Sequence, residues 1–217
     1  MELYEAMRCA PTSRRFKPDP VPREVLMRAL ENARFAPSGG NRQGWRVVVV
    51  EEPERRRALR DLYLPAWRAY TEQTGAAQML ARPEDFEPRR TRMVKLADEY
   101  AETLDQVPVH LVIGVRLEDL AVTDAELPRQ SIVGGASIYP FVQNLLLALR
   151  GENLAAAMTT LLVPAETEVR KLLEIPDEIA LAAHVGVGYR ANDWPKQLSR
   201  KPVSEFAFSE RFGDPLS

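Results

Sequence analysis

Residues 131–150, SIVGGASIYPFVQNLLLALR, restrict the fold more than any other segment. The segment has the length of a helix but is apolar on nearly every side, and such a helix must be buried all round. A chain of 217 residues can enclose one such helix at its centre, but an interface between two subunits encloses it more readily. Pro140 would clash with the carbonyl group of Ala136, so we expect a kink or break there.

The rest of the chain shows the periodicities of helices and strands in alternation. We expect helices over residues 2–9, 21–36, 52–67, 92–104 and 165–175. We expect buried strands over residues 45–51, 108–115, 154–162 and 178–189. The polar tail, 195–217, is typical of an extended arm rather than a helix.

Residues 66–92 lose clear apolar periodicity and gather Gly, Pro and charge. The segment is too long for a plain connector, which favours a lid or a partner-covering excursion. Three aromatic residues stand at helical spacing around its start: Tyr63, Trp67 and Tyr70. They either pack in the core or form an aromatic lid over a ligand that selects flat acceptors.

Composition excludes several classes of function. The net charge of −2 favours neither nucleic acid nor a membrane as partner. No apolar run approaches the roughly 18 residues of a membrane span, and the N-terminus lacks the apolar core of a signal peptide. The single cysteine, Cys9, excludes an internal disulfide. We therefore expect a cytoplasmic protein.

The usual catalytic sets are missing. His110 and His184 both lie inside apolar strands, where we expect satisfied core residues, and no metal-ligand spacing occurs. The chain has no P-loop and no Gly-x-Ser-x-Gly sequence.

What remains is a scattered set of polar groups. Arg14 and Arg15 follow two hydroxyl residues, a long turn spans residues 37–43, and Thr159 and Thr160 end a strand. Guanidinium groups bind phosphate through paired hydrogen bonds, and glycines let a flat ring approach the backbone. Together these pieces predict a cofactor with a phosphate end and a planar, hydrogen-bonding end.

In order and spacing, these residues resemble the nitroreductase family of FMN-dependent oxidoreductases. Residues 14–54 are similar to the N-terminal signature of that family, and residues 137–149 to its central helix. TTLL, 159–162, resembles its flavin-edge strand, and VGVGY, 185–189, with SRKPVSE, 199–205, resembles its C-terminal signature. The resemblance covers nearly the whole chain except the excursion.

The resemblance implies an α+β fold, a nitroreductase-like mixed, mainly antiparallel sheet flanked by helices. It also implies an intertwined homodimer with two FMN sites at the interface, embraced by the C-terminal arms. Each subunit would be a single nitroreductase-like domain, residues 1–217, with the lid-like excursion at about 66–92.

Site residues follow from the resemblance position by position. Arg14 would reach the O2/N1 edge of the flavin, and Arg200 would bind the phosphate, with Ser199 and Lys201 beside it. The remaining cofactor-binding residues would be Thr12, Ser13, Pro37, Ser38, Gly39, Asn41, Gln43, Met158, Thr159 and Thr160. The last three would lie near N5. No side chain need act as a catalytic acid or base, because the flavin carries the chemistry.

The implied reaction is the transfer of hydride from NAD(P)H through the flavin to an electron-poor acceptor, with ping-pong kinetics. Nitroaromatics, quinones and conjugated carbonyls are the expected acceptors. One alternative is an FMN-binding or storage protein with little turnover. Another is a specialised relative, either a flavin-fragmenting enzyme or a dehalogenase of the iodotyrosine type. That dehalogenase would need a Glu-Tyr-Lys set in the excursion, and residues 66–92 contain no Lys. A deazaflavin remains open.

Two positions depart from the family pattern. The family often has an arginine where this chain has Ala10 or Pro11, so a phosphate contact is missing or is supplied by Arg8. A charge-assisted hydrogen bond contributes roughly 1.5–3 kcal/mol, so without compensation FMN would bind about tenfold more weakly or worse. The family's Gly-Leu-Gly before the threonine strand reads Asn153, Leu154, Ala155 here. Asn tolerates a left-handed backbone.

Overall fold

The computed structural model describes residues 1–216. Its four strands form one sheet in the order β1-β2-β4-β3, and every neighbouring pair is antiparallel. The strands are β1 (Trp45–Val50), β2 (Val109–Arg116), β3 (Ala155–Thr159) and β4 (Ile179–Gly188). Within the described chain, the single parallel pairing is an isolated bridge between Thr12 and Ala156. The predicted α+β class with a mainly antiparallel sheet is confirmed.

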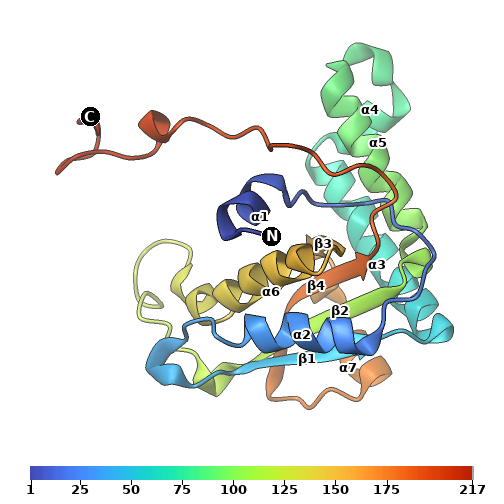
Figure 1. Ribbon diagram of the computed structural model, residues 1–217, viewed down its shortest axis with the longest axis horizontal. Coiled ribbons are helices and arrows are strands. Elements are labelled where there is room, and N and C mark those ends of the chain that lie inside the picture. The colour runs from blue at the N-terminus through green and yellow to red at the C-terminus, as the bar shows by residue number, and fades with distance from the viewer. Residues whose placement is uncertain (217) are drawn as a thin grey trace.

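Helices cover both faces of the sheet (Figure 1). One face packs against α2 (Arg23–Ala33) and α6 (Tyr139–Gly151), and α1 (Leu3–Cys9) lies against α6. The other face packs against α3 (Pro53–Gln73), the end of α5 (Pro88–Glu102) and α7 (Glu166–Leu173). The short α4 (Ala76–Ala81) and the outer ends of α3 and α5 project away from the sheet, and the C-terminal arm extends from the body (Figure 1).

The central strand β2 divides the interior into two cores. Its residues Leu111 and Ile113 face the α2–α6 layer, whereas Val112 faces the α3–α7 layer. This alternation is the period of two that a strand imposes on its side chains. Because both faces are covered, β2 is buried from Val109 to Val115.

The predicted break at Pro140 is confirmed. A 3-10 turn, Val133–Ser137, ends at Ile138, whose φ of −125° is not helical, and α6 begins at Tyr139. Pro140 therefore lies in the first turn of α6, where the missing N–H has no helical partner to lose. Burial of α6 is incomplete within this chain, because Leu146 and Leu147 are only half-buried.

Two expectations were wrong, one about the secondary structure of residues 66–92 and one about the burial of the first strand. The segment 66–92 is mostly helical: α3 continues to Gln73, and α4 and the start of α5 lie within it. Its apolar pattern is hard to see because α3 buries a narrow stripe of about one residue per turn: Leu59, Tyr63, Trp67 and Thr71. The strand at 45–51 was expected to be buried, but β1 is an edge strand in which Val50 alone is buried.

Both long helices of this projection begin at a Glu-Pro pair. The carboxylate of Glu52 accepts hydrogen bonds from the backbone N–H groups of Glu54 and Arg55, at 3.0 and 2.9 Å. Glu87 accepts two equivalent bonds, at 2.8 and 2.7 Å, from the second and third residues that follow it. Each proline stands where its ring suits the first helical turn. Of residues 1–216, no helix is both long and apolar enough to cross a membrane.

His110 and His184 lie side by side in the core, as expected, but they are not fully satisfied, because Nε2 of His110 and Nδ1 of His184 are buried without a hydrogen-bond partner in the described chain. Their rings stack at 5.0 Å, and Nδ1 of His110 is 2.7 Å from Nε2 of His184. Burial, together with the neighbouring His184, holds the pKa of His110 well below its usual value. Burial lowers the pKa of His184 to about 4. Both rings are therefore neutral in the folded protein at neutral pH.

This pair predicts a loss of stability in mild acid. Between pH 6.5 and about 4 the unfolded chain binds protons that the folded chain refuses, so the free energy of unfolding falls as the pH falls. The slope is about 1.4 kcal/mol per pH unit for each histidine. Urea unfolding at pH 7.0, 6.0 and 5.0 measures it. The chain has only two histidines, so equal stabilities at pH 7.0 and 5.0 would contradict the prediction.

Candidate functional site

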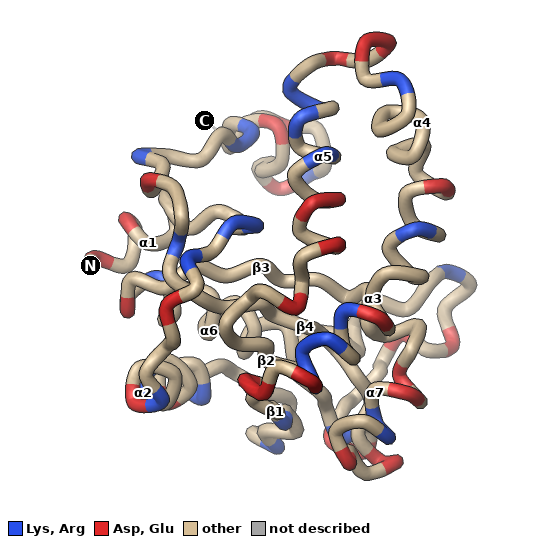
Figure 2. The backbone as a smooth tube through the Cα atoms, turned by 90° about the vertical axis from the view of Figure 1, so that its right-hand side faces the viewer, with Lys and Arg blue, Asp and Glu red and all other residues tan. Residues whose placement is uncertain are grey.

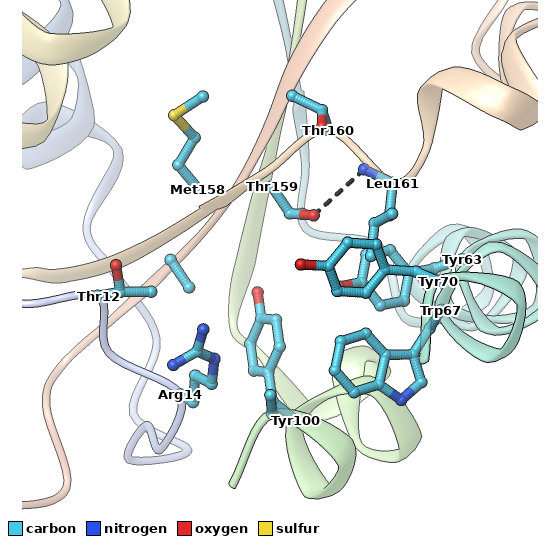
Figure 3. Close-up of a pocket in the computed structure, with 12 residues that line it drawn as sticks. Thr12, Arg14, Tyr63, Trp67, Tyr70, Tyr100, Met158, Thr159, Thr160 and Leu161 are labelled. Atoms are coloured by element: carbon cyan, nitrogen blue, oxygen red, sulfur yellow. Dashed lines mark hydrogen bonds between the residues drawn. The ribbon is translucent and has the colours of Figure 1, made fainter. Parts of the chain in front are cut away.

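A pocket of about 330 Å³ opens where four elements meet (Figure 3). The segment that follows α1 forms one wall, the end of β3 forms the floor, and α3 and α5 form the opposite side. The residues that line the pocket are Thr12, Arg14, Tyr63, Trp67, Tyr70, Ala97, Tyr100, Ala157, Met158, Thr159, Thr160 and Leu161. Eight of the residues predicted from sequence are in this set: Thr12, Arg14, Met158, Thr159, Thr160 and the three aromatic residues of α3.

Backbone pairing orients the segment after α1. Thr12 bridges Ala156 of β3, and the N–H of Ser13 donates to the carbonyl of Ala156 at 2.9 Å. Because side chains alternate along an extended chain, Thr12 and Arg14 face the pocket. Ser13 is 1% exposed, and its hydroxyl accepts a hydrogen bond from Arg190.

Arg14 is the one cationic side chain in the pocket lining, and no acidic residue accompanies it. The neighbouring Arg15 forms an ion pair with Glu99 at 2.7 Å. Arg14 forms no ion pair or hydrogen bond through its side chain with the described residues. In Figure 3 its guanidinium points toward the same space as the hydroxyls of Tyr63 and Tyr100. The pocket thus presents a positive group with unused donors.

The aromatic residues of α3 belong to both the core and the pocket. Tyr63 and Trp67 are 3% and 6% exposed, whereas Tyr70 is 46% exposed. The indole N–H of Trp67 donates to Oδ1 of Asp98 at 2.7 Å, and the ring centroids of Trp67 and Tyr70 are 6.0 Å apart. The ion pairs of Arg68 with Asp98 and Glu102 tie α3 to α5 beside them. These contacts hold a fixed aromatic wall with an exposed outer edge.

Tyr100 of α5 was not predicted as a site residue. It is 4% exposed, its hydroxyl has no hydrogen-bond partner in the described chain, and burial raises its pKa. A side chain at Gly186 would place its Cβ 2.4 Å from that hydroxyl. Gly186 on β4 therefore makes the room that Tyr100 occupies. In the sequence, Tyr100 looks like one more apolar residue of a helix, and nothing links it to Gly186 of the VGVGY segment.

The long turn does not reach this pocket. None of residues 37–43 lines it, and the N–H of Gly39 donates instead to the hydroxyl of Ser137 at 3.0 Å. Asn41 and Gln43 have φ values of 53° and 52°, in the left-handed region that non-glycine residues rarely adopt. Strain of this kind is common at functional sites. Pro37 and Ser38 belong to the same turn, and its role stays a prediction.

Arg200 also lies apart from the pocket. It is on the exposed C-terminal arm, where its side chain donates to the carbonyl of Ser199 at 2.8 Å. Its role as a phosphate ligand stays a prediction.

The backbone tolerates the departure from the family pattern at residues 153–155. Asn153 has a φ of 61°, the left-handed conformation that was expected there, and Ala155 is an ordinary strand residue at the start of β3. The departure at Ala10 and Pro11 leaves no cation at either position. Arg8, one turn earlier, is exposed.

The lining contains no acid, histidine, lysine or cysteine, the side chains that most often act as general bases or nucleophiles. The side-chain groups that line the pocket are aromatic rings, hydroxyls, aliphatic groups, a thioether and one guanidinium. They suit a flat ring with a hydrogen-bonding edge that attracts positive charge. Fold and pocket together define an α+β protein whose chemistry would come from a bound cofactor.

A model of the nitroreductase family matches residues 11–189, most of the chain. The protein belongs to the nitroreductase family. Among curated proteins it is 32% identical to an NADH dehydrogenase of Thermus thermophilus, covering 83% of this chain and 82% of that one. It is 28% identical to a 5,6-dimethylbenzimidazole synthase of Rhodobacter capsulatus, covering 86% and 82%.

Solved structures share the fold. An FMN and NADPH-dependent nitroreductase from a Sphingopyxis strain superimposes with a TM-score of 0.70 at 21% identity, over 98% of this chain and all of that one. An iodotyrosine deiodinase bound to FMN and 3-iodotyrosine gives a TM-score of 0.66 at 24% identity, over 96% and 100%. The family thus includes several reactions on one architecture, and fold alone does not choose among them.

The close approach of Gly186 and Tyr100 gives a test of the pocket geometry. Gly186→Ala should lower the free energy of unfolding by about 1–3 kcal/mol, because its methyl group overlaps the Tyr100 hydroxyl in a packed core. Removing that hydroxyl should relieve the overlap. Stability measured by urea unfolding should therefore recover in the double variant Gly186→Ala/Tyr100→Phe. A double variant as unstable as Gly186→Ala would show that the two residues do not meet.

Proposed function

We propose that the protein is an FMN-dependent oxidoreductase that passes hydride from NAD(P)H to electron-poor acceptors, namely nitroaromatics, quinones or conjugated carbonyls. The observation that carries the proposal is the unpaired guanidinium of Arg14 in an aromatic pocket without acids. A cation held there without a partner favours a ligand that carries or gains negative charge. Membership of the nitroreductase family supports flavin as that ligand.

The residues present fit FMN. Arg14 would donate to the O2/N1 edge of the ring, and its charge would stabilise the negative charge that a reduced ring carries. Met158, Thr159 and Thr160 would lie along the other edge, near N5. Tyr100 offers a buried hydroxyl whose hydrogen-bonding capacity is unused by the described residues. When bound, FMN supplies hydride transfer in two half-reactions, from the donor and then to the acceptor.

A neighbouring recess supports an anionic donor. This recess, of about 310 Å³, shares Arg14, Trp67 and Tyr70 with the first pocket and adds Arg90 of α5. The basic residues of α5 gather in its first two turns, toward the projecting tip, and its acids in the last turns (Figure 2). A positive approach to an aromatic recess suits the phosphates and the flat ring of a nicotinamide dinucleotide. The α3–α5 projection would act as the wall that keeps water from the bound rings.

The proposal includes a homodimer. The turn at 37–43 lies outside the pocket of its own chain, and a second copy of the chain would bring this turn to the cofactor. Large apolar side chains remain exposed in the single chain: Tyr4 at 72%, Phe35 at 72%, Ile132 at 72% and Phe206 at 63%. Contact with a second copy of the chain would bury these side chains.

Two alternatives to this function are FMN storage and deiodination. A storage protein would bind FMN with little turnover, and the missing cation at Ala10 and Pro11 leaves that open. A deiodinase of the iodotyrosine type is disfavoured, since residues 66–92 contain no Lys to pair with a zwitterionic substrate.

The purified protein, loaded with FMN, should lose its flavin absorbance within seconds when it is mixed anaerobically with NADPH or NADH. A nitroaromatic or a quinone should then restore the absorbance. Stopped-flow absorbance near the flavin band measures both half-reactions. Colour that persists with both donors would contradict the oxidoreductase and favour storage. Mass identification of the released chromophore separates FMN from a deazaflavin.

Arg200→Ala should weaken FMN binding by about tenfold or more, because one charge-assisted hydrogen bond to the phosphate is lost. Sedimentation should show that the dimer stays intact, because the guanidinium forms no ion pair among the described residues. Arg57→Ala, which removes an exposed cation of α3 that lines neither the pocket nor its neighbouring recesses, is the control. FMN affinity equal to that of the unmodified protein would remove Arg200 from the phosphate site.

A further inference from the structure

A second, smaller recess adjoins the pocket on the side of α6. It has a volume of about 70 Å³ and shares Thr12 and Met158 with the larger pocket. Its other walls include Ala10 and Pro11, the two positions that lack the family's arginine, together with Arg150. A ligand with its ring in the larger pocket could therefore reach this recess with a short tail.

Arg150, near the end of α6, is a buried cation without a partner. The residue is 7% exposed, and its Nε atom is buried with no hydrogen-bond partner in the described chain. Its guanidinium carbon lies 3.8 Å from the ring centroid of Trp194, and no Asp or Glu of residues 1–216 forms an ion pair with it. A buried charge without a counter-charge is strongly destabilising.

A second guanidinium stands beside the first. Arg190 lies over the same Trp194 ring at 5.4 Å, and it donates to the hydroxyl of Ser13 and to the carbonyl of Asp193. Burial, and then the charge of Arg150, lower the pKa of Arg190. Arg190 likewise forms no ion pair within residues 1–216. Arg190 does not line the recess, but its charge adds to that of Arg150. Two cations over one aromatic ring, with no acid between them, favour an anion beside Arg150.

We propose that Arg150, supported by the neighbouring charge of Arg190 over the same Trp194 ring, binds the phosphate of the flavin nucleotide in place of the arginine that Ala10 and Pro11 do not supply. This assignment rests on the proposed function. A water needs roughly 10–15 Å³ of cavity volume, so a recess of about 70 Å³ suits the five heavy atoms of a phosphate group. Guanidinium forks bind phosphate through paired hydrogen bonds, and the neighbouring Thr12 hydroxyl adds a donor.

Two rival roles for Arg150 predict different results. The C-terminus of α6 carries partial negative charge that favours a cation nearby, but it leaves Nε without an acceptor. A carboxylate from a second copy of the chain could also pair with Arg150. In that case its removal would weaken the dimer rather than the affinity for a phosphate.

The test compares FMN with riboflavin, which has the same ring and no phosphate. Arg150→Met should weaken FMN binding by about tenfold or more and leave riboflavin affinity within about twofold, measured by quenching of flavin fluorescence. Arg190→Met should act in the same direction. Arg34→Met, which removes an exposed arginine paired with Glu31 on α2, should change neither affinity.

A second readout needs no flavin. Inorganic phosphate should raise the melting temperature of the cofactor-free protein and should raise that of Arg150→Met much less. Without phosphate, Arg150→Met should melt no lower than the parent, because the charge it removes has no partner.

Several outcomes would overturn the assignment. Equal affinities of the parent protein for FMN and riboflavin would refute the phosphate site but would leave the proposed function standing. Equal loss of both affinities in Arg150→Met, or dissociation of the dimer in sedimentation, would give Arg150 a structural role instead. Binding of neither flavin by the parent protein would overturn the proposed function, and this inference with it.

Discussion

The hydrogen bond from the N–H of Ser13 to the carbonyl of Ala156 holds the candidate site together. It fixes the segment after α1 alongside β3, and the alternation of an extended chain then divides three consecutive side chains between two spaces. Thr12 and Arg14 face the aromatic pocket, and Ser13 turns to Arg190. A slip of one residue would reverse every one of these directions. This one backbone pairing therefore directs Arg14 into the larger pocket and places the Ser13 hydroxyl where it accepts a hydrogen bond from Arg190.

Local rules predicted the parts of the structure that local rules decide. The break before α6 follows from the ring of Pro140, and the left-handed turn at Asn153 follows from the side chain that tolerates it. The strands β1 and β2 were found because β-branched runs stand out from their surroundings. The position of each strand within the sheet could not be predicted from local rules. Residues 45–51 are as apolar as a central strand, yet β1 lies at the edge, since its place depends on which strands pair.

The candidate site was predicted where its residues carry a recognisable chemistry, as Arg14 and Thr159 do. Tyr100 could not be found in this way, because its hydroxyl matters only through the space that Gly186, 86 residues later, leaves for it. Arg150 was hidden for a similar reason: at the end of an apolar helix it looks like a solvated cap. Its burial arises from Trp194, far along the chain. Long-range contacts of this kind leave no periodic trace in a sequence.

Three unused polar groups lie around the two adjoining recesses, although buried nitrogen atoms without a partner also occur elsewhere, as in the histidine pair of the core. Arg14 and Tyr100 lie at the larger one and Arg150 at the smaller, and each lacks a partner that a core selected for stability alone would supply. Asp124 is the opposite case: it is 3% exposed and accepts hydrogen bonds from a guanidinium, a hydroxyl and two backbone N–H groups. These bonds lower the pKa of Asp124 to about 2. A chain that satisfies one buried charge so fully, and leaves two guanidiniums without counter-charge beside a shared cavity wall, is arranged for an anionic ligand that spans both spaces.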